Sequence, residues 1–338
     1  MASSNSSSTK KKNEDEEKEV KVIIQNGSKG YEPIVLDDIQ WQTDRKGSPG
    51  KLTLKVIQDE DLNVEEGNAI SLKVGKTSVF YGYIFRIARD KTKIISLTCY
   101  DQMRYMKNKD TYNFENTTAN RIAGMICSDF GIKTGELEET AYVIKYVVYD
   151  NKTLMDMVQD ALDMTLTNTK QLYVMYDDYG KLTIKQIARM KVGLLIDADT
   201  AESFDFESSI DDETYNRIKL MYEDSETHER TVWTAADSGT QQKWGTLQYF
   251  ESINKDEKES AESKANTLLS LYNTKTKRLT INNVIGDLRV RAGSMVLVQL
   301  EMGTEKISNW MVVDSCTHTF KQNEHFMSLK VIGGGYVG

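Results

Sequence analysis

The chain of 338 residues is acidic, with 51 Asp and Glu against 43 Lys and Arg, and its formal charge at pH 7 is −8. This balance argues against a nucleic-acid-binding protein, which usually carries a basic patch. Its three cysteines lack a CxxC pair and argue against a disulfide framework, and the chain has no run of about 18 apolar residues that could cross a membrane.

Residues 1–18 form a polar segment of Ser, Lys, Glu and Asp without an apolar core. A secretory signal would need an apolar stretch of about 7–15 residues, so this segment is not expected to be one. Segments with so few apolar residues cannot bury enough surface to offset the entropy lost on ordering. We therefore predict a disordered polar arm that becomes ordered only against a partner.

Residues 19–110 contain short runs in which apolar and polar residues alternate, as in residues 20–24, 52–56 and 70–74. Polar and glycine-containing turns separate these runs. Alternation with a period of two indicates antiparallel strands that bury one face. This part of the chain is therefore predicted to be a β domain, either a barrel or a sandwich.

The pattern changes in residues 111–210. Residues 117–130 have apolar side chains four apart, and residues 153–167 carry a longer apolar stripe that begins with a capping-box-like Thr153. Both stretches predict amphipathic helices. Residues 172–187 read as two strands around a polar turn. Together they predict a small α+β middle domain.

The densest group of carboxylates lies at the end of this domain. It consists of Asp197, Asp199, Glu202, Asp205, Glu207, Asp211, Asp212 and Glu213. Calcium takes about six to eight oxygen ligands, but the run lacks the order of a calcium-binding loop, and Phe204 and Phe206 interrupt it. We therefore interpret it as an acidic, solvated linker between domains.

Residues 211–338 return to strand-like runs. Residues 217–221 and 231–234 predict strands, and residues 257–272 predict an amphipathic helix. Strand-like runs then continue from residue 279 to residue 332. This part is predicted to be a second β domain with a flanking helix.

A stretch near the start of the chain recurs near its end. Residues 61–74 align without a gap with residues 287–300, and they share Asp-Leu-x-Val-x-x-Gly followed by apolar residues at every second position. Gly67 and Gly293 hold equivalent places, where we expect a turn with positive φ. Solenoid repeats are only about 20–50 residues apart, so these copies indicate two similar domains. Such a chain can form a ring with twice as many modules as chains.

Signals for an active site are sparse. The histidines His228, His318 and His325 lack the spacing of a metal site, and a structural zinc site would need about four close N or S ligands. We assign them structural or surface roles. The glycine-rich residues 333–338 lack the following helix that a phosphate loop needs. We predict no catalytic, cofactor-binding or metal-ligating residue, and no enzymatic activity.

Several stretches resemble the XkdQ/YqbQ family of phage-like tail proteins and together cover nearly all of the chain beyond the arm. They are residues 47–53, 98–112, 150–154, 176–182, 243–250 and 290–294. The resemblance implies an α+β fold that is mainly β. In it, two tube-like antiparallel β-barrel modules, residues 19–110 and 211–338, flank the α+β middle domain of residues 111–210.

The resemblance also implies a function: a structural baseplate hub of a contractile tail, in a phage or an R-type bacteriocin. Three copies would form a homotrimeric, pseudo-sixfold ring that joins the sixfold tail tube to the central spike. The implied partners are the tail tube or tube-initiator protein, the spike, baseplate wedge proteins and the tape measure protein. Assembly would take place in the cytoplasm of the bacterial host, and the product would be part of the particle.

Two other functions remain open at this point. A tail-associated peptidoglycan hydrolase is the main alternative, but a lytic domain would add its own module with a recognisable acid or nucleophile. The three regions described above already use the length of the chain. A soluble ligand-binding protein is the third hypothesis, and it would be a monomer in solution.

Overall fold

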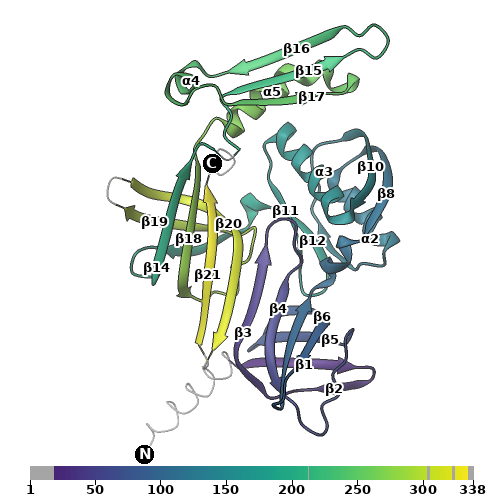
Figure 1. The fold of residues 1–338 in the computed structure, drawn as a ribbon, viewed down its shortest axis with the longest axis vertical. Coiled ribbons are helices and arrows are strands. Elements are labelled where there is room, and N and C mark those ends of the chain that lie inside the picture. The colour runs from purple at the N-terminus through teal and green to yellow at the C-terminus, as the bar shows by residue number, and fades with distance from the viewer. Residues whose placement is uncertain (1–18, 212, 303–304, 322–323, 334–338) are drawn as a thin grey trace, which may run out of the picture.

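The computed structural model describes residues 19–211, 213–302, 305–321 and 324–333, so the predicted arm of residues 1–18 lies outside it. The described part is mainly β, as predicted. Figure 1 shows two groups of long strands side by side, with two smaller regions of sheet and helix next to them. A single sheet of 13 described strands runs through both groups.

The first group of strands, module one, follows from the alternating runs near the start of the chain. In β4, for example, Leu52, Leu54 and Val56 are buried while the residues between them are more exposed. In the sheet the strands lie in the order β3-β4-β7-β6-β5-β1-β2. Their bounds are β1 (Val20–Asn26), β2 (Lys29–Tyr31), β3 (Val35–Asp44), β4 (Lys51–Ile57), β5 (Ala69–Val74), β6 (Thr77–Arg89) and β7 (Ile94–Tyr100).

The second group, module two, has the order β14-β18-β21-β20-β19-β13. Its strands are β13 (Lys191–Ile196), β14 (Ser203–Ser209), β18 (Thr276–Ile285), β19 (Met295–Met302), β20 (Glu305–Lys321) and β21 (Glu324–Gly333). Strand for strand, this order matches β3-β4-β7-β6-β5-β1. One difference is that β1 runs antiparallel to β5, whereas β13 runs parallel to β19. The sequence repeat therefore corresponds to a repeated strand order.

The repeated glycines occupy the same turn in both modules. Gly67 has a φ of 89° and Gly293 a φ of 92°, a region that side chains with a Cβ rarely adopt. The Gly67 N–H donates to the carbonyl of Ile84, and the Gly293 N–H donates to the carbonyl of Val313, each over 2.8 Å. The turn predicted from the sequence is thus present twice, with the same hydrogen bond to the neighbouring strand.

A β-bulge is repeated as well. The pairing of β6 with β7 shifts register between Ile84 and Arg86, and the pairing of β20 with β21 shifts between Val313 and Ser315. A bulge bends a strand at a fixed place. Its recurrence makes Arg86 the equivalent of Ser315, and it sets the residue-by-residue equivalence of β6 and β20.

The two glycines offer a matched pair of substitutions. A Cβ on Gly67 would meet nothing within 4 Å, whereas one on Gly293 would lie 2.7 Å from Cγ1 of Val174. Gly67→Ala is expected to cost about 1–2 kcal/mol from backbone strain alone. Gly293→Ala should cost a further 1–3 kcal/mol or so from overpacking. Urea denaturation of both variants measures the difference, and equal losses would contradict the crowding at Gly293.

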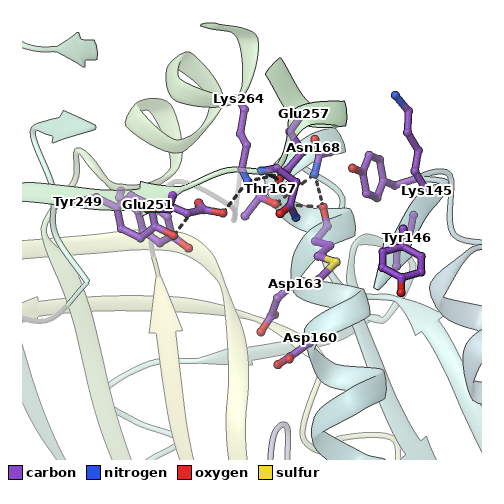
Figure 2. A pocket seen from close by; sticks show the side chains of 16 residues that line it. Lys145, Tyr146, Asp160, Asp163, Thr167, Asn168, Tyr249, Glu251, Glu257 and Lys264 are labelled. Atoms are coloured by element: carbon purple, nitrogen blue, oxygen red, sulfur yellow. Dashed lines mark hydrogen bonds and ion pairs between the residues drawn. The ribbon is translucent and has the colours of Figure 1, made fainter. Parts of the chain in front are cut away.

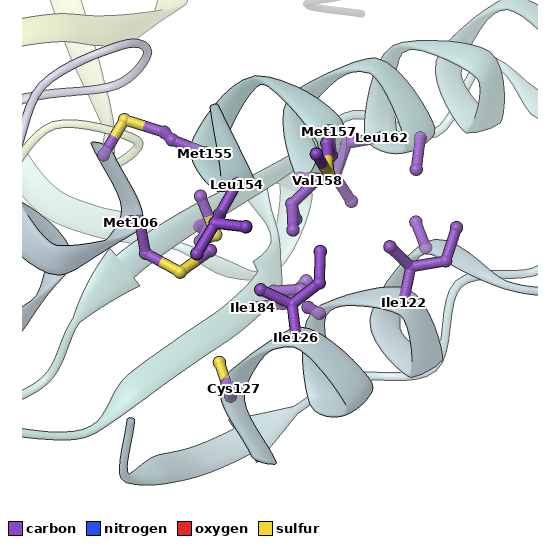
Figure 3. Packing of buried hydrophobic residues seen from close by; sticks show 14 of the residues in the cluster. Met106, Ile122, Ile126, Cys127, Leu154, Met155, Met157, Val158, Leu162 and Ile184 are labelled. Atoms are coloured by element: carbon purple, nitrogen blue, oxygen red, sulfur yellow. The ribbon is translucent and has the colours of Figure 1, made fainter. Parts of the chain in front are cut away.

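The middle region contains the two predicted helices, α2 (Ala119–Asp129) and α3 (Leu154–Thr169). Thr153 caps α3 as predicted, because its Oγ1 accepts a hydrogen bond from the backbone N–H of Asp156 over 3.1 Å. Figure 3 shows the apolar stripe of α3 facing α2. The other elements are η1 (Gln102–Lys107), β8 (Lys109–Thr117), β9 (Thr134–Leu137), β10 (Ile144–Thr153), β11 (Tyr173–Asp177), β12 (Leu182–Gln186) and η2 (Ile187–Arg189).

Between β14 and β18 the chain forms a further small region, the inserted region, with its own core. Its sheet has the order β16-β15-β17, and Ala261, Ala265 and Leu268 of α5 pack on it with Ile218 and Leu220. The elements are β15 (Arg217–Glu223), β16 (Arg230–Ala236), α4 (Ser238–Trp244), β17 (Gln248–Ser252), η3 (Lys255–Ser260) and α5 (Ala261–Tyr272).

The predicted acidic linker needs correction. Within residues 197–213 the chain forms β14, which pairs with β18 from Ser203 opposite Asn282 to Ser209 opposite Thr276. Phe204 and Phe206 pack against the core of module two, while Asp205 and Glu207 are exposed. The alternation of phenylalanine with carboxylate is the pattern of a strand with one buried face. The prediction of a linker relied on the number of charges and overlooked this alternation. β14 is a charged strand at the edge of the sheet.

Candidate functional site: the junction of the folded regions

The two modules are joined by a β-ladder within the chain. β3 of module one pairs antiparallel with β20 of module two, from Ile39 opposite Phe320 to Asp44 opposite Ser315. The ladder ends at Arg45, whose side chain forms an ion pair of 2.9 Å with Asp314. One module therefore continues the sheet of the other.

His318, a buried residue of this ladder, lies against the half-buried His325 of β21. The ring of His318 stacks on Trp41 of β3, with 4.8 Å between the ring centres. Nε2 of His318 lies 2.9 Å from the carbonyl of Val290, which can only accept, so this nitrogen donates. Nδ1 then accepts from Nε2 of His325 over 2.8 Å.

Burial lowers the pKa of His318 to about 3, with the charge of His325 as the next cause, and burial lowers the pKa of His325 to about 4. Both rings are neutral at pH 7.

The stability of the protein should therefore depend on these histidines in acid. Both have a folded-state pKa below the ordinary 6.5, so their contribution is complete above pH 6.5 and is lost as the pH falls. Each of the two histidines lowers the free energy of unfolding by about 1.4 kcal/mol per pH unit as the pH falls from about 6 to about 4. His325→Gln should reduce that slope in urea denaturation, and substitution of the exposed His228 should not. Equal slopes in wild type and His325→Gln would contradict the prediction.

A buried arginine connects module two to the middle region. Arg291 follows β18 in the repeated turn, and its guanidinium lies 3.9 Å from the ring centre of Tyr176. It also donates to the backbone carbonyl of Asp177 over 2.9 Å. Burial lowers the pKa of Arg291, but guanidinium stays charged in proteins. The repeated turn of module two therefore places a cation between the folded regions.

Two buried carboxyl groups accompany this arginine. Asp101 accepts hydrogen bonds from the backbone N–H of Gly50 over 2.8 Å and from that of Met103 over 3.0 Å. Burial raises its pKa, as does the charge of Asp177. Burial also raises the pKa of Asp177 to about 6, although the Gly180 N–H donates to it over 2.7 Å and opposes the rise. Module one, the middle region and module two thus meet at one ionic cluster.

A pocket of about 500 Å³ lies between the middle region and the inserted region. Figure 2 shows its carboxylates coming from α3 on one side and from β17 and η3 on the other. Each of them has a lysine partner: Asp163 pairs with Lys46, Asp160 with Lys152, and Glu251 and Glu257 with the buried Lys264. Burial lowers the pKa of Lys264, but the two carboxylates outweigh it and raise the pKa overall. These carboxylates are therefore paired within their own region, apart from Asp163, whose partner Lys46 belongs to module one.

The family follows from comparison with known proteins. The family model described as YqbQ-like matches residues 39–332. The chain belongs to the YqbQ-like family. It is 28% identical over 309 residues to the uncharacterized protein YqbQ of Bacillus subtilis (strain 168), covering 88% of this chain and 92% of that one. It is 26% identical over 307 residues to the phage-like element PBSX protein XkdQ of the same strain, covering 88% and 93%. The family suggested by the sequence is confirmed.

Solved structures show where this YqbQ-like fold occurs. The 43 kDa tail protein of prophage MuSo2 from Shewanella oneidensis is similar to it with a TM-score of 0.68, over 94% of this chain and 100% of that chain. The two sequences are 13% identical. The similarity therefore shows a shared fold. None of the helices in the described part of the YqbQ-like chain is long and apolar enough to cross a membrane.

The structure brings together only some of the residues that the sequence singled out. In this YqbQ-like chain His318 and His325 meet at the junction, whereas His228 is exposed. In the described residues no group of three or more His, Cys, Asp or Glu side chains could hold a metal ion. Asp212 and residues 334–338 lie outside the description. Arg291 was not singled out by the sequence analysis. The repeat could have indicated it, because Arg291 aligns there with Glu65, a residue of opposite charge.

Proposed function

We propose that the protein is a structural hub of a contractile tail baseplate. Three copies would form a homotrimeric ring of six similar modules on the tail axis, joining the tail tube to the central spike. The duplicated module supports this proposal most directly. One chain holds two copies of a six-strand order, joined edge to edge by β3 and β20. A contact of this head-to-tail kind forms a ring when its rotation closes.

Family and fold support the same conclusion. A relative is named as a protein of the phage-like element PBSX, and a similar fold occurs in a prophage tail protein. We infer that the present chain is part of a tail particle assembled in the host cytoplasm, and that its partners are the tube or tube-initiator protein, the spike, wedge proteins and the tape measure protein. We further infer that it is not an enzyme, because the pocket carboxylates described above all have lysine partners.

Light scattering tests the ring. The purified protein should give a mass of three times the 38.5 kDa chain, and mixing it with its tube protein should add the mass of the bound tube protein to that of the trimer. Averaged electron micrographs should show six lobes around a hole. A particle with twofold symmetry alone would reject the proposal. Clearing of peptidoglycan by the purified protein in a zymogram would favour the hydrolase instead.

A further inference from the structure

The ladder between β3 and β20 has an unused counterpart elsewhere in the chain. In the repeat, β14 corresponds to β3, because each lies beside the equivalent strand, β18 or β4. β6 corresponds to β20 through the shared bulge and the shared turn. The joint that links module one to module two within a chain therefore predicts a joint between β14 and β6. These strands are seven steps apart in the order of the sheet, so the second joint needs two chains.

Both of these strands have an edge that no described strand covers. β14 pairs with β18 on one side, and no other described strand pairs with it. From Arg86 to Arg89, β6 pairs with β7 on one side, while the pairing with β5 ends at Tyr83. The equivalent part of β20, from Ser315 to Phe320, has β21 on one side and β3 on the other. Exposed edges of this kind are ready to pair with another chain.

The two edges are opposite in charge overall, and in the register derived below the one like-charge pair is Asp205 opposite Asp90. β14 exposes Asp205 and Glu207, while Arg86 and Arg89 of β6 are exposed. Lys91 and Lys93 follow β6, and Asp90 is the one acid among them, with its carboxylate accepting from Thr92. Trp41 and His318 are buried in the existing joint. Their equivalents are Phe206, which is half-buried in the single chain, and Arg89, which is exposed. A second copy would bury that phenylalanine under a guanidinium, a favourable contact.

The repeat also gives the register. Leu52 and Leu279 are equivalent, and their partners are Trp41 and Phe206. Since Trp41 lies opposite His318, Phe206 should lie opposite Arg89. One step further, Gln42 lies opposite Thr317, which puts Glu207 opposite Ala88. Glu207 then has Arg86 as its diagonal neighbour on the same face.

We propose that β14 of one chain pairs antiparallel with β6 of the next, in this register, and so continues the sheet around the ring. The inference rests on the proposed function, since it names the contact by which three chains close. The partner is a second copy of this chain. The edge that module two contributes is acidic and the edge that module one contributes is basic. Module two of one chain therefore pairs with module one of the next.

Cysteine cross-linking tests the register. A chain carrying both Glu207→Cys and Ala88→Cys should give covalent dimers and trimers on oxidation, reversed by reductant, because both sites are exposed in the single chain. The three native cysteines are buried and should give little background. Either single variant should stay uncross-linked. A control that pairs Glu207→Cys with Lys29→Cys, on β2 at the opposite end of the sheet, should also stay uncross-linked.

The outcomes separate the joint from the ring. A trimer in light scattering without the cross-link between positions 207 and 88 overturns the joint and leaves the proposed function standing. A chain that stays monomeric with its tube protein overturns both.

Charge reversal gives a second measurement. Glu207→Lys or Arg86→Glu alone should raise the trimer dissociation constant about tenfold or more, and the double variant should recover most of the lost affinity. Failure of that recovery would contradict the predicted diagonal contact.

Discussion

Replacing Arg291 with methionine is expected to lower the free energy of unfolding by about 3–5 kcal/mol at pH 8, because it removes the cation from a buried ionic cluster. Asp101 and Asp177 would then be buried without it. The loss should be smaller at pH 5.5, since Asp177 has a pKa raised to about 6 and can take up a proton there. Urea denaturation at both pH values measures the change.

Two variants control this prediction. Arg289→Met removes an exposed arginine that pairs with Asp287 two residues away, and surface pairs of this kind contribute about 0–1 kcal/mol. Arg291→Lys keeps the charge but loses the planar group that lies over Tyr176, so its loss should be intermediate. A loss at Arg291→Met no larger than that at Arg289→Met would show that the cluster does not hold the regions together.

Excision of residues 210–275 should leave both modules folded. Ser209 and Thr276 lie opposite one another in the ladder of β14 and β18, so an Asn-Gly turn can join these strands directly. The inserted region has its own core around Ile218, Leu220 and Leu268. Its Leu271 also packs in a second cluster with Leu166, Leu172 and Val174, so we expect a stability loss of about 2–5 kcal/mol, as for large truncations in a core.

The contrasting excision removes residues 111–210. That change deletes the middle region but also deletes β13 and β14, which belong to the sheet of module two. It should therefore abolish the trimer, whereas excision of 210–275 should preserve it. Circular dichroism and light scattering compare the two proteins. If the 111–210 excision formed the trimer and the 210–275 excision did not, β14 would not be needed for the contact between chains.

The sequence was most informative where a local pattern sets the structure. Period-two alternation identified the strands of module one, the apolar stripe after Thr153 identified α3, and the turn before Gly67 recurred before Gly293. In each case residues close in sequence determine the geometry. The comparison of two copies of the turn also compensated for the weakness of any single signal.

Contacts between distant residues were not predictable in this way. Arg291 has no local signal of burial, because Tyr176 and Asp177 come from a hairpin more than 100 residues earlier. The inserted region was merged with the second β domain, because strands from both carry the same alternation. β14 was hidden by its carboxylates, which are tolerated because they point to solvent on an edge strand.

The covalent connection between the modules has a consequence for assembly. Because β3 and β20 belong to one chain, they meet at the effective concentration that their tether imposes, which can reach millimolar values or so for short tethers. In the proposed ring, half of the module contacts would then form during folding, independent of how much protein the cell makes. The remaining half would depend on encounters between chains, and only rings with an even number of modules could close.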